Sequence, residues 1–339
     1  MERSNSELDP NLNAEIYRNM TPADIPPTVD RHLQFILISD GIGAILGASN
    51  MTDRYWSGTV WFYKNHDNFD RHKATTAMKT DSGVCDAACL GGSNKFVIGE
   101  DSGVIQILSV NEMADARGYE MQCLGYSFEH DDAIKSISAF DTNTRLVTGG
   151  MDYCIKVWDM VELYSTNTFS PAHTDIVTCV QAQPKSNDVF ASTSLDHEAL
   201  LWDLRLSKPA HSIIKDVECG LTAAAWNPNT GHEIVVGDAD GKIVVLDVRQ
   251  SNGEPVYQIP KAFSRGVHRL LFNPVRSNQV AGCCDSTEVK TFDSSKEMNI
   301  IYENKEHQDF VRGLAWDNNC LITASWDNKV LKHVIPSQS

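Results

Sequence analysis

The sequence predicts an all-β fold, a closed propeller of seven blades, and three observations support this prediction. A unit of similar length recurs along most of the chain, each copy contains short apolar strands separated by polar turns, and several copies end in an aromatic-Asp pair. Strands of roughly five to seven residues broken by Gly, Asn and Asp are typical of antiparallel sheets. Because one small sheet cannot bury both of its faces, we expect the repeats to stack radially.

The repeats are marked by an Asp in the turn between the second and third strands. We expect five such residues: Asp152, Asp196, Asp240, Asp285 and Asp327. Their successive spacings are 44, 44, 45 and 42 residues by subtraction, close to the roughly 40–45 residues of one propeller blade. Two more divergent repeats, at 31–63 and 84–110, precede them, which makes seven blades.

Polar residues recur at fixed offsets within the plainer repeats. The three sets are His130, Thr148, Asp152 and Trp158; His173, Ser192, Asp196 and Trp202; and His307, Thr323 and Asp327. They resemble the sets of WD-repeat propellers, a resemblance that implies a chain of hydrogen bonds from indole to hydroxyl to imidazole to carboxylate. Such a network satisfies buried polar groups and fixes one blade geometry. In the last set His333 replaces the Trp, so we expect an altered network there.

Catalysis is not expected. A His, an Asp and a hydroxyl could be mistaken for a catalytic triad, but their recurrence in successive blades favours a structural role. The chain has no Gly-x-Ser-x-Gly or His-Glu-x-x-His motif. The Gly-containing stretches 41–47 and 237–243 lack the spacing of nucleotide-binding loops and are expected to be turns. The nine cysteines lack zinc-site spacing, so we predict no metal and no cofactor.

Charge and composition narrow the class of partner and the compartment. Of 339 residues, 29 are Lys or Arg and 45 are Asp or Glu, a formal charge of −16, which disfavours nucleic acid and favours basic partners. No apolar run approaches the roughly 20 residues of a membrane-spanning helix, and the N-terminus lacks a secretory pattern. We expect a protein of the cytoplasm and the nucleus.

Two units are expected along the chain. The propeller is assigned to 28–336, preceded by a polar, proline-punctuated extension at 1–27 that is partly disordered or contributes a latch strand. The last repeat is followed by only four residues, too few for a fourth strand, so a strand from the opposite terminus is needed to close the ring. The candidate is 13–18.

The first blade carries the strongest candidate for partner binding. The stretch 50–58, between its second and third strands, is expected to be a loop longer than its counterparts, and it contains Arg54, Tyr55 and Trp56. Arg, Tyr and Trp are enriched at binding hot spots because they bury large areas at modest entropic cost. The alternative is that Trp56 folds back onto its own blade.

A weaker candidate lies at the end of the fourth blade. Trp202, Asp203 and Arg205 match the WD-x-Arg box of propellers that dock on the adaptors of cullin-type ubiquitin ligases. Because the repeat itself requires Trp and Asp, only Arg205 adds information.

Several stretches together resemble the methylosome WD-repeat family. They are 53–61, 130–132, 154–159, 307–312, 326–327 and 333–336, spread over nearly the whole chain, whereas 113–119 and both termini depart from the family. The resemblance implies a propeller subunit that partners the type II protein arginine methyltransferase, which makes symmetric dimethylarginine on histones and Sm proteins. It also implies that Trp56 fills an apolar pocket of that partner and that Arg54 makes polar contacts.

The sequence therefore predicts a non-catalytic scaffold that presents arginine-rich basic substrates, such as histone tails and Sm proteins, within a hetero-oligomer. An acidic surface would attract and orient such substrates. Two alternatives are a substrate receptor of a cullin-type ubiquitin ligase and a stand-alone histone-binding propeller.

Overall fold

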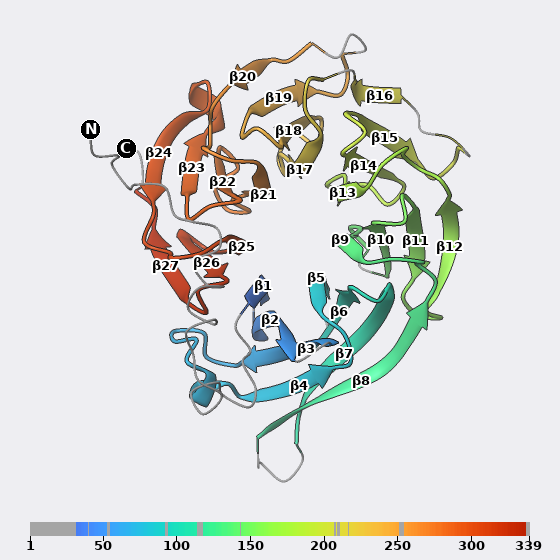
Figure 1. Ribbon diagram of the computed structural model, residues 1–339, viewed down its shortest axis with the longest axis vertical. Helices are drawn as coiled ribbons and strands as arrows, with labels where there is room; N and C mark the ends of the chain where they lie inside the picture. The colour runs from blue at the N-terminus through green and yellow to red at the C-terminus, as the bar shows by residue number, and fades with distance from the viewer. Residues whose placement is uncertain are drawn as a thin grey trace.

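The computed structural model describes residues 32–39, 41–52, 55–91, 94–113, 118–142, 144–206, 208, 211–215, 217–250 and 254–336, with only the backbone at 51, 52, 55 and 56. The predicted seven-bladed propeller is confirmed, because seven sheets are arranged radially around a central axis (Figure 1). In the described part of the chain, two short 3-10 helices, η1 (Arg71–Lys73) and η2 (Ser294–Lys296), lie outside the sheets. Among the described residues no helix is long and apolar enough to cross a membrane.

Every blade is antiparallel, and its strands run in chain order from the centre to the rim. The first three blades contain β1 (His32–Ser39), β2 (Gly43–Thr52), β3 (Tyr55–Tyr63) and β4 (Thr76–Thr80); β5 (Val84–Leu90), β6 (Lys95–Glu100), β7 (Val104–Glu112) and β8 (Tyr119–Phe128); and β9 (Ile134–Ala139), β10 (Arg145–Gly150), β11 (Ile155–Asp159) and β12 (Tyr164–Phe169). The next two contain β13 (Val177–Ala182), β14 (Val189–Ser194), β15 (Ala199–Asp203) and β16 (His211–Ile214); and β17 (Leu221–Trp226), β18 (Glu233–Asp238), β19 (Ile243–Asp247) and β20 (Tyr257–Ile259). The last two contain β21 (Val267–Phe272), β22 (Gln279–Cys284), β23 (Val289–Asp293) and β24 (Asn299–Asn304); and β25 (Val311–Asp317), β26 (Cys320–Ser325) and β27 (Val330–Val334).

The core lies between blades rather than within them. Apolar side chains of each sheet pack against the facing sheet of the next blade, as Ile105 of the second blade and Trp158 of the third do in one shared cluster. Trp61 of the first blade and Ile322 of the seventh share another cluster, so the two ends of the ring are joined by side-chain packing. Because each sheet is buried only by its neighbours, the blades stabilise one another around the whole ring.

The seventh sheet contains three strands among the described residues, in the order β25-β26-β27. The predicted latch at 13–18, like the extension at 1–27, lies outside the described residues. Closure of this blade by that segment stays a prediction.

One turn aspartate was assigned incorrectly from the sequence. The residue before the turn Asp donates its backbone N–H to the loop that enters the inner strand, as Met151 does to the carbonyl of Ala133 at 2.8 Å. Asp285 makes this same bond to Gly266 at 2.9 Å, so it stands one position earlier than expected and Ser286 occupies the turn position. The prediction for Asp285 is wrong because repeat lengths vary, so spacing alone does not fix a turn position to the exact residue. The pairing of β22 with β23 does fix it, at Ser286.

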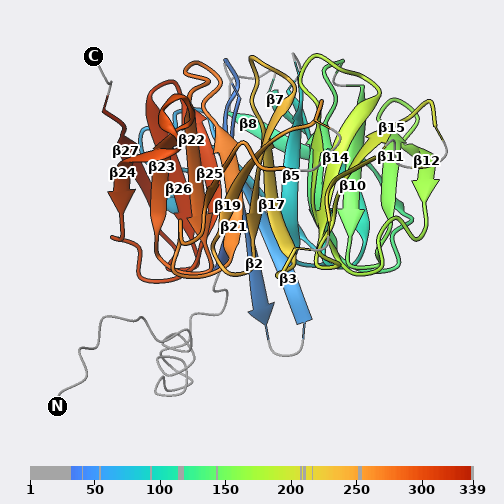
Figure 2. The same cartoon turned by 90° about the horizontal axis from the view of Figure 1, so that it is seen from above.

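Outside residues 53 and 54, which lie outside the described residues, the first-blade stretch 50–58 is strand and not loop, which corrects a second prediction. β2 and β3 continue through it as paired strands of 10 and 9 residues, whereas β10 and β11 have 6 and 5. Their register extends to the pair Thr52 and Tyr55. The resulting hairpin projects well beyond the disc of the propeller (Figure 2).

Candidate functional site

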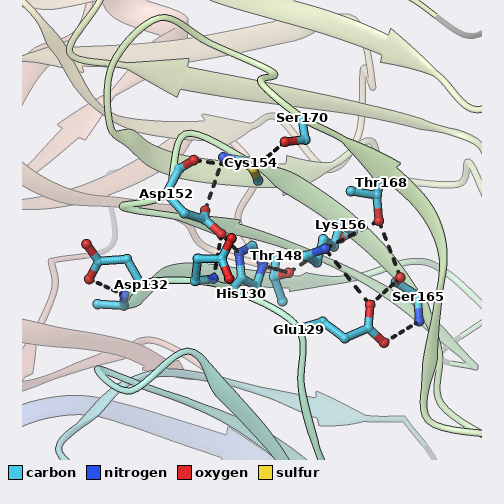
Figure 3. Close-up of polar contacts among 12 residues, drawn as sticks. Glu129, His130, Asp132, Thr148, Asp152, Cys154, Lys156, Ser165, Thr168 and Ser170 are labelled. Carbon is cyan, nitrogen blue, oxygen red and sulfur yellow. Dashed lines mark hydrogen bonds and ion pairs between the residues drawn. The ribbon is translucent and has the colours of Figure 1, made fainter.

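A buried polar network joins the four recurring residues of the third blade. Trp158 donates from Nε1 to Oγ1 of Thr148 over 2.8 Å, and this oxygen lies 2.7 Å from Nε2 of His130. His130 Nδ1 lies 2.8 Å from a carboxylate oxygen of Asp152 (Figure 3). Burial opposes ionisation of Asp152, yet its hydrogen bonds and the neighbouring imidazole hold its pKa below the usual value. The network therefore ends on a stabilised carboxylate.

The fourth blade contains the same arrangement. Trp202 donates to Ser192 over 2.8 Å, Ser192 lies 2.7 Å from His173, and His173 lies 2.8 Å from Asp196. Burial lowers the pKa of His173 in spite of the adjacent carboxylate. The neutral imidazole can then donate to Asp196 from Nδ1 and accept the Ser192 hydroxyl proton at Nε2.

The seventh blade has a modified network. His307 lies 3.0 Å from Asp327 and 2.7 Å from Thr323, as in the other blades. The place of the indole is taken by His333, whose Nε2 lies 2.9 Å from Oγ1 of Thr323. Tyr302 adds a further contact, 2.9 Å from its hydroxyl to Nδ1 of His333, which no repeat motif indicated. Burial and the nearby His307 lower the pKa of His333 to about 4.

These networks are closed to substrates. The imidazoles of His130, His173 and His307 are fully buried, as are the hydroxyl-bearing residues beside them. The polar atoms of these residues hydrogen-bond one another. The residues therefore stabilise the blade, and their hydroxyl groups are not arranged as nucleophiles.

The base of the β2–β3 hairpin is held tightly by its neighbours. Ser49 donates from its hydroxyl to the carbonyl of Val84 in the second blade over 2.7 Å. Opposite it, Gly58 is needed because a Cβ there would lie 2.3 Å from Oγ1 of Thr80. The hairpin is therefore fixed at its root and presents its tip away from the propeller.

Two of the three predicted hot-spot residues lie towards the end of this hairpin. Tyr55 and Trp56 belong to the start of β3, where only the backbone is described, and Arg54 lies outside the described residues. Their role in partner binding, and the alternative that Trp56 folds back, stay predictions.

The predicted adaptor box is placed at the end of β15. Trp202 is buried in the network above, while Arg205 is 75% exposed and forms an ion pair with Asp203. The same turn recurs in the fifth blade, where Arg249 pairs with Asp247 without a preceding Trp. The Asp-x-Arg pair is thus a local turn structure that two blades share. Adaptor binding through Trp202, Asp203 and Arg205 stays a prediction.

Among the described residues, no cluster of three or more His, Cys, Asp and Glu side chains has the arrangement of a metal site. The cysteines in this part of the chain are unpaired. Burial raises the pKa of Cys85, Cys283 and Cys284 to about 12, so these thiols stay protonated and unreactive.

Comparison with known proteins agrees with this architecture. A sequence profile of the WD domain, G-beta repeat, matches residues 121–159 and 164–203, which include β11 and β15 with their terminal Trp-Asp pairs. The chain therefore contains WD repeats in this region. The WD-repeat networks described above then account for the recurring His, Ser or Thr, Asp and Trp.

Relatives of this WD-repeat chain are more specific. It is 28% identical to Methylosome protein WDR77 of Xenopus laevis over 87% of this chain and 86% of that protein. It is 27% identical to Protein valois of Drosophila melanogaster over 64% of this chain and 61% of that protein. It is 24% identical to Protein SOF1 of Saccharomyces cerevisiae, of which it covers 40%. The predicted resemblance to the methylosome WD-repeat family is confirmed by the first of these.

Proposed function

We propose that this chain is the non-catalytic scaffold of a methylosome, holding a type II protein arginine methyltransferase and presenting arginine-rich substrates such as histone tails and Sm proteins. The observation that carries the proposal is the β2–β3 hairpin, which leaves the disc of the propeller and is anchored at its root by Ser49 and Gly58. A projection that is anchored at its root and has Tyr55 and Trp56 near its end suits insertion into a pocket of a partner.

Two further observations support the scaffold role. The likeness to Methylosome protein WDR77 covers most of both chains. The formal charge of −16 is suited to long-range attraction of Arg-rich segments. The compartment, cytoplasm and nucleus, stays a prediction from the sequence.

The test is capture of the type II methyltransferase by the full chain and by its Trp56→Ala variant. The matched control is Tyr153→Ala, since Tyr153 is an aromatic residue, 42% exposed, in the corresponding turn of the third blade. We expect the wild type and the control to bind and Trp56→Ala to lose binding while melting at an unchanged temperature. Equal binding by both variants contradicts the role of the hairpin, and absence of binding by the wild type contradicts the proposed function.

A further inference from the structure

All seven inner strands contain a β-bulge near the start of the strand. In each case one residue of the inner strand has no partner in the second strand. In β5 this residue is Cys85, between Val84 and Asp86. In β9 it is Lys135, between Ile134 and Ser136. A bulged residue is free of the ladder and is redirected out of the sheet. The seven bulge residues all line the central channel, a cavity of about 830 Å³. They form a ring with one side chain from each blade.

Two members of this ring are cations and the other five are uncharged. Lys135 comes from the third blade and Arg312 from the seventh, and Lys135 forms no ion pair with any described residue. The uncharged members are Gln34, Cys85, Thr178, Thr222 and His268. Burial and the charge of Arg312 hold the pKa of His268 well below its usual value, so the imidazole is neutral. The ring is positive in a chain whose overall charge is strongly negative.

Arg312 is positioned with unused hydrogen-bonding capacity. Its guanidinium lies 5.1 Å from the ring of Phe310 and 5.0 Å from that of Trp326. Its Nη1 contacts a carboxylate oxygen of Asp285 and Nδ1 of His268, each at 2.6 Å. Its Nε and the indole Nε1 of Trp326 are buried and have no hydrogen-bond partner among the described residues. Buried N–H groups without acceptors are rare, so two of them at one mouth indicate a missing acceptor.

One position after the bulge residues His268 and Cys85, an ion pair spans the channel. Arg269 pairs with Asp86, and the second carboxylate oxygen of Asp86 accepts from the backbone N–H of Ile137 at 2.8 Å. The opposite charges of Arg269 and Asp86 cancel. The pair therefore does not compensate the positive charge of Lys135. The charges of Lys135, Arg269 and Arg312 all act on His268, which places them around one region.

We propose that this mouth of the central channel is a binding site for a small polyanion, either a phosphate ester or a polycarboxylate. Lys135 and the unused N–H groups of Arg312 and Trp326 supply the donors, and Phe310 and Trp326 hold the guanidinium in place. Trp326 and Asp285 belong to turns between second and third strands, so the site faces the same side as the β2–β3 hairpin. The site is independent of the hairpin contact and goes beyond the scaffold role.

The test is isothermal titration of the full chain at low ionic strength with pyrophosphate and, separately, with citrate. We expect saturable binding of at least one anion, and the stronger of the two identifies phosphate or carboxylate as the source. Lys135→Gln should raise its Kd about three- to fivefold, the scale of one partly screened charge pair. Asp285→Asn should lower the Kd, because the competing carboxylate is removed while Arg312 keeps an acceptor.

The matched control is Lys79→Gln, an exposed lysine on the outer strand β4 that makes the same change in net charge. It should bind as the wild type does. No saturable binding of either anion overturns the proposal. So does an equal loss in Lys135→Gln and Lys79→Gln, which would show diffuse attraction, or weaker binding by Asp285→Asn.

Discussion

Arg269 in β21 and Asp86 in β5, which are 183 residues apart in the sequence, form an ion pair across the central channel. Figure 1 shows these strands on opposite sides of the axis. Asp86 is almost fully buried and Arg269 is about one quarter exposed at its side chain. The pair therefore links the second and sixth blades directly, without passing through the blades between them.

Removing one partner of this pair should destabilise the fold. We expect Arg269→Leu to lower the free energy of unfolding by about 2–3 kcal/mol, somewhat below the roughly 3–5 kcal/mol of a fully buried pair because the guanidinium is partly solvated. Urea unfolding followed by tryptophan fluorescence measures the change. Arg205→Leu, which breaks the exposed pair with Asp203, serves as the control and should leave the midpoint unchanged. Similar losses in both variants would contradict a special role for the channel pair.

The third-blade network makes a separate prediction. Thr148→Val removes the hydroxyl that serves both Trp158 and His130 while keeping the side-chain shape. Both nitrogens then lose their buried partner, and we expect a loss of about 1–3 kcal/mol in the free energy of unfolding. Thr166→Val, at an exposed position of β12, is the matched control. If the two variants unfold at the same denaturant concentration, the network contributes nothing to stability.

His333 should make stability depend on pH. Its folded pKa is about 4, against an ordinary value of 6.5, so the unfolded chain takes up a proton that the folded chain refuses. The contribution of His333 is complete above pH 6.5 and is lost as the pH falls towards 4, by at most about 3 kcal/mol. The side chain of the His333→Gln variant cannot be protonated, so its stability should fall less steeply than that of the wild type between pH 6.5 and 4. Melting curves between pH 7 and 4 measure it, with the exposed His72→Gln expected to follow the wild type.

Gly58 makes a prediction about the hairpin root. A methyl group at this position would meet Oγ1 of Thr80 at 2.3 Å and the carbonyl of Ser82 at 2.8 Å. Gly58→Ala should therefore destabilise the chain by about 1–3 kcal/mol and speed proteolytic cleavage of the hairpin. Gly125→Ala, where the nearest atom is the tip of Leu163 at 3.2 Å, should be tolerated. Cleavage of the two variants at equal rates would show that the root is not tightly held.

Much of the fold was predictable because its determinants are local. Alternation of apolar residues, turn chemistry and repeat spacing identified seven blades. The recurrence of His130 and Asp152 at equivalent positions in other repeats marked the networks that the structure contains. The misplacement of Asp285 by one residue shows the limit of spacing, because only strand pairing distinguishes a turn residue from its neighbour.

The sequence by itself determined the propeller class, the residues of the polar networks and the excess of acidic over basic residues. Each of these depends only on residue type and on the order of residues within one repeat. Only the tertiary structure decided that β2 and β3 stay paired as far as Thr52 and Tyr55 and project from the disc, because residue type alone does not specify how far two strands pair. It also decided which residues meet in the channel. Lys135 and Arg312 share one mouth, and Asp86 meets Arg269, only because the closed ring brings the bulges of distant strands to a common axis.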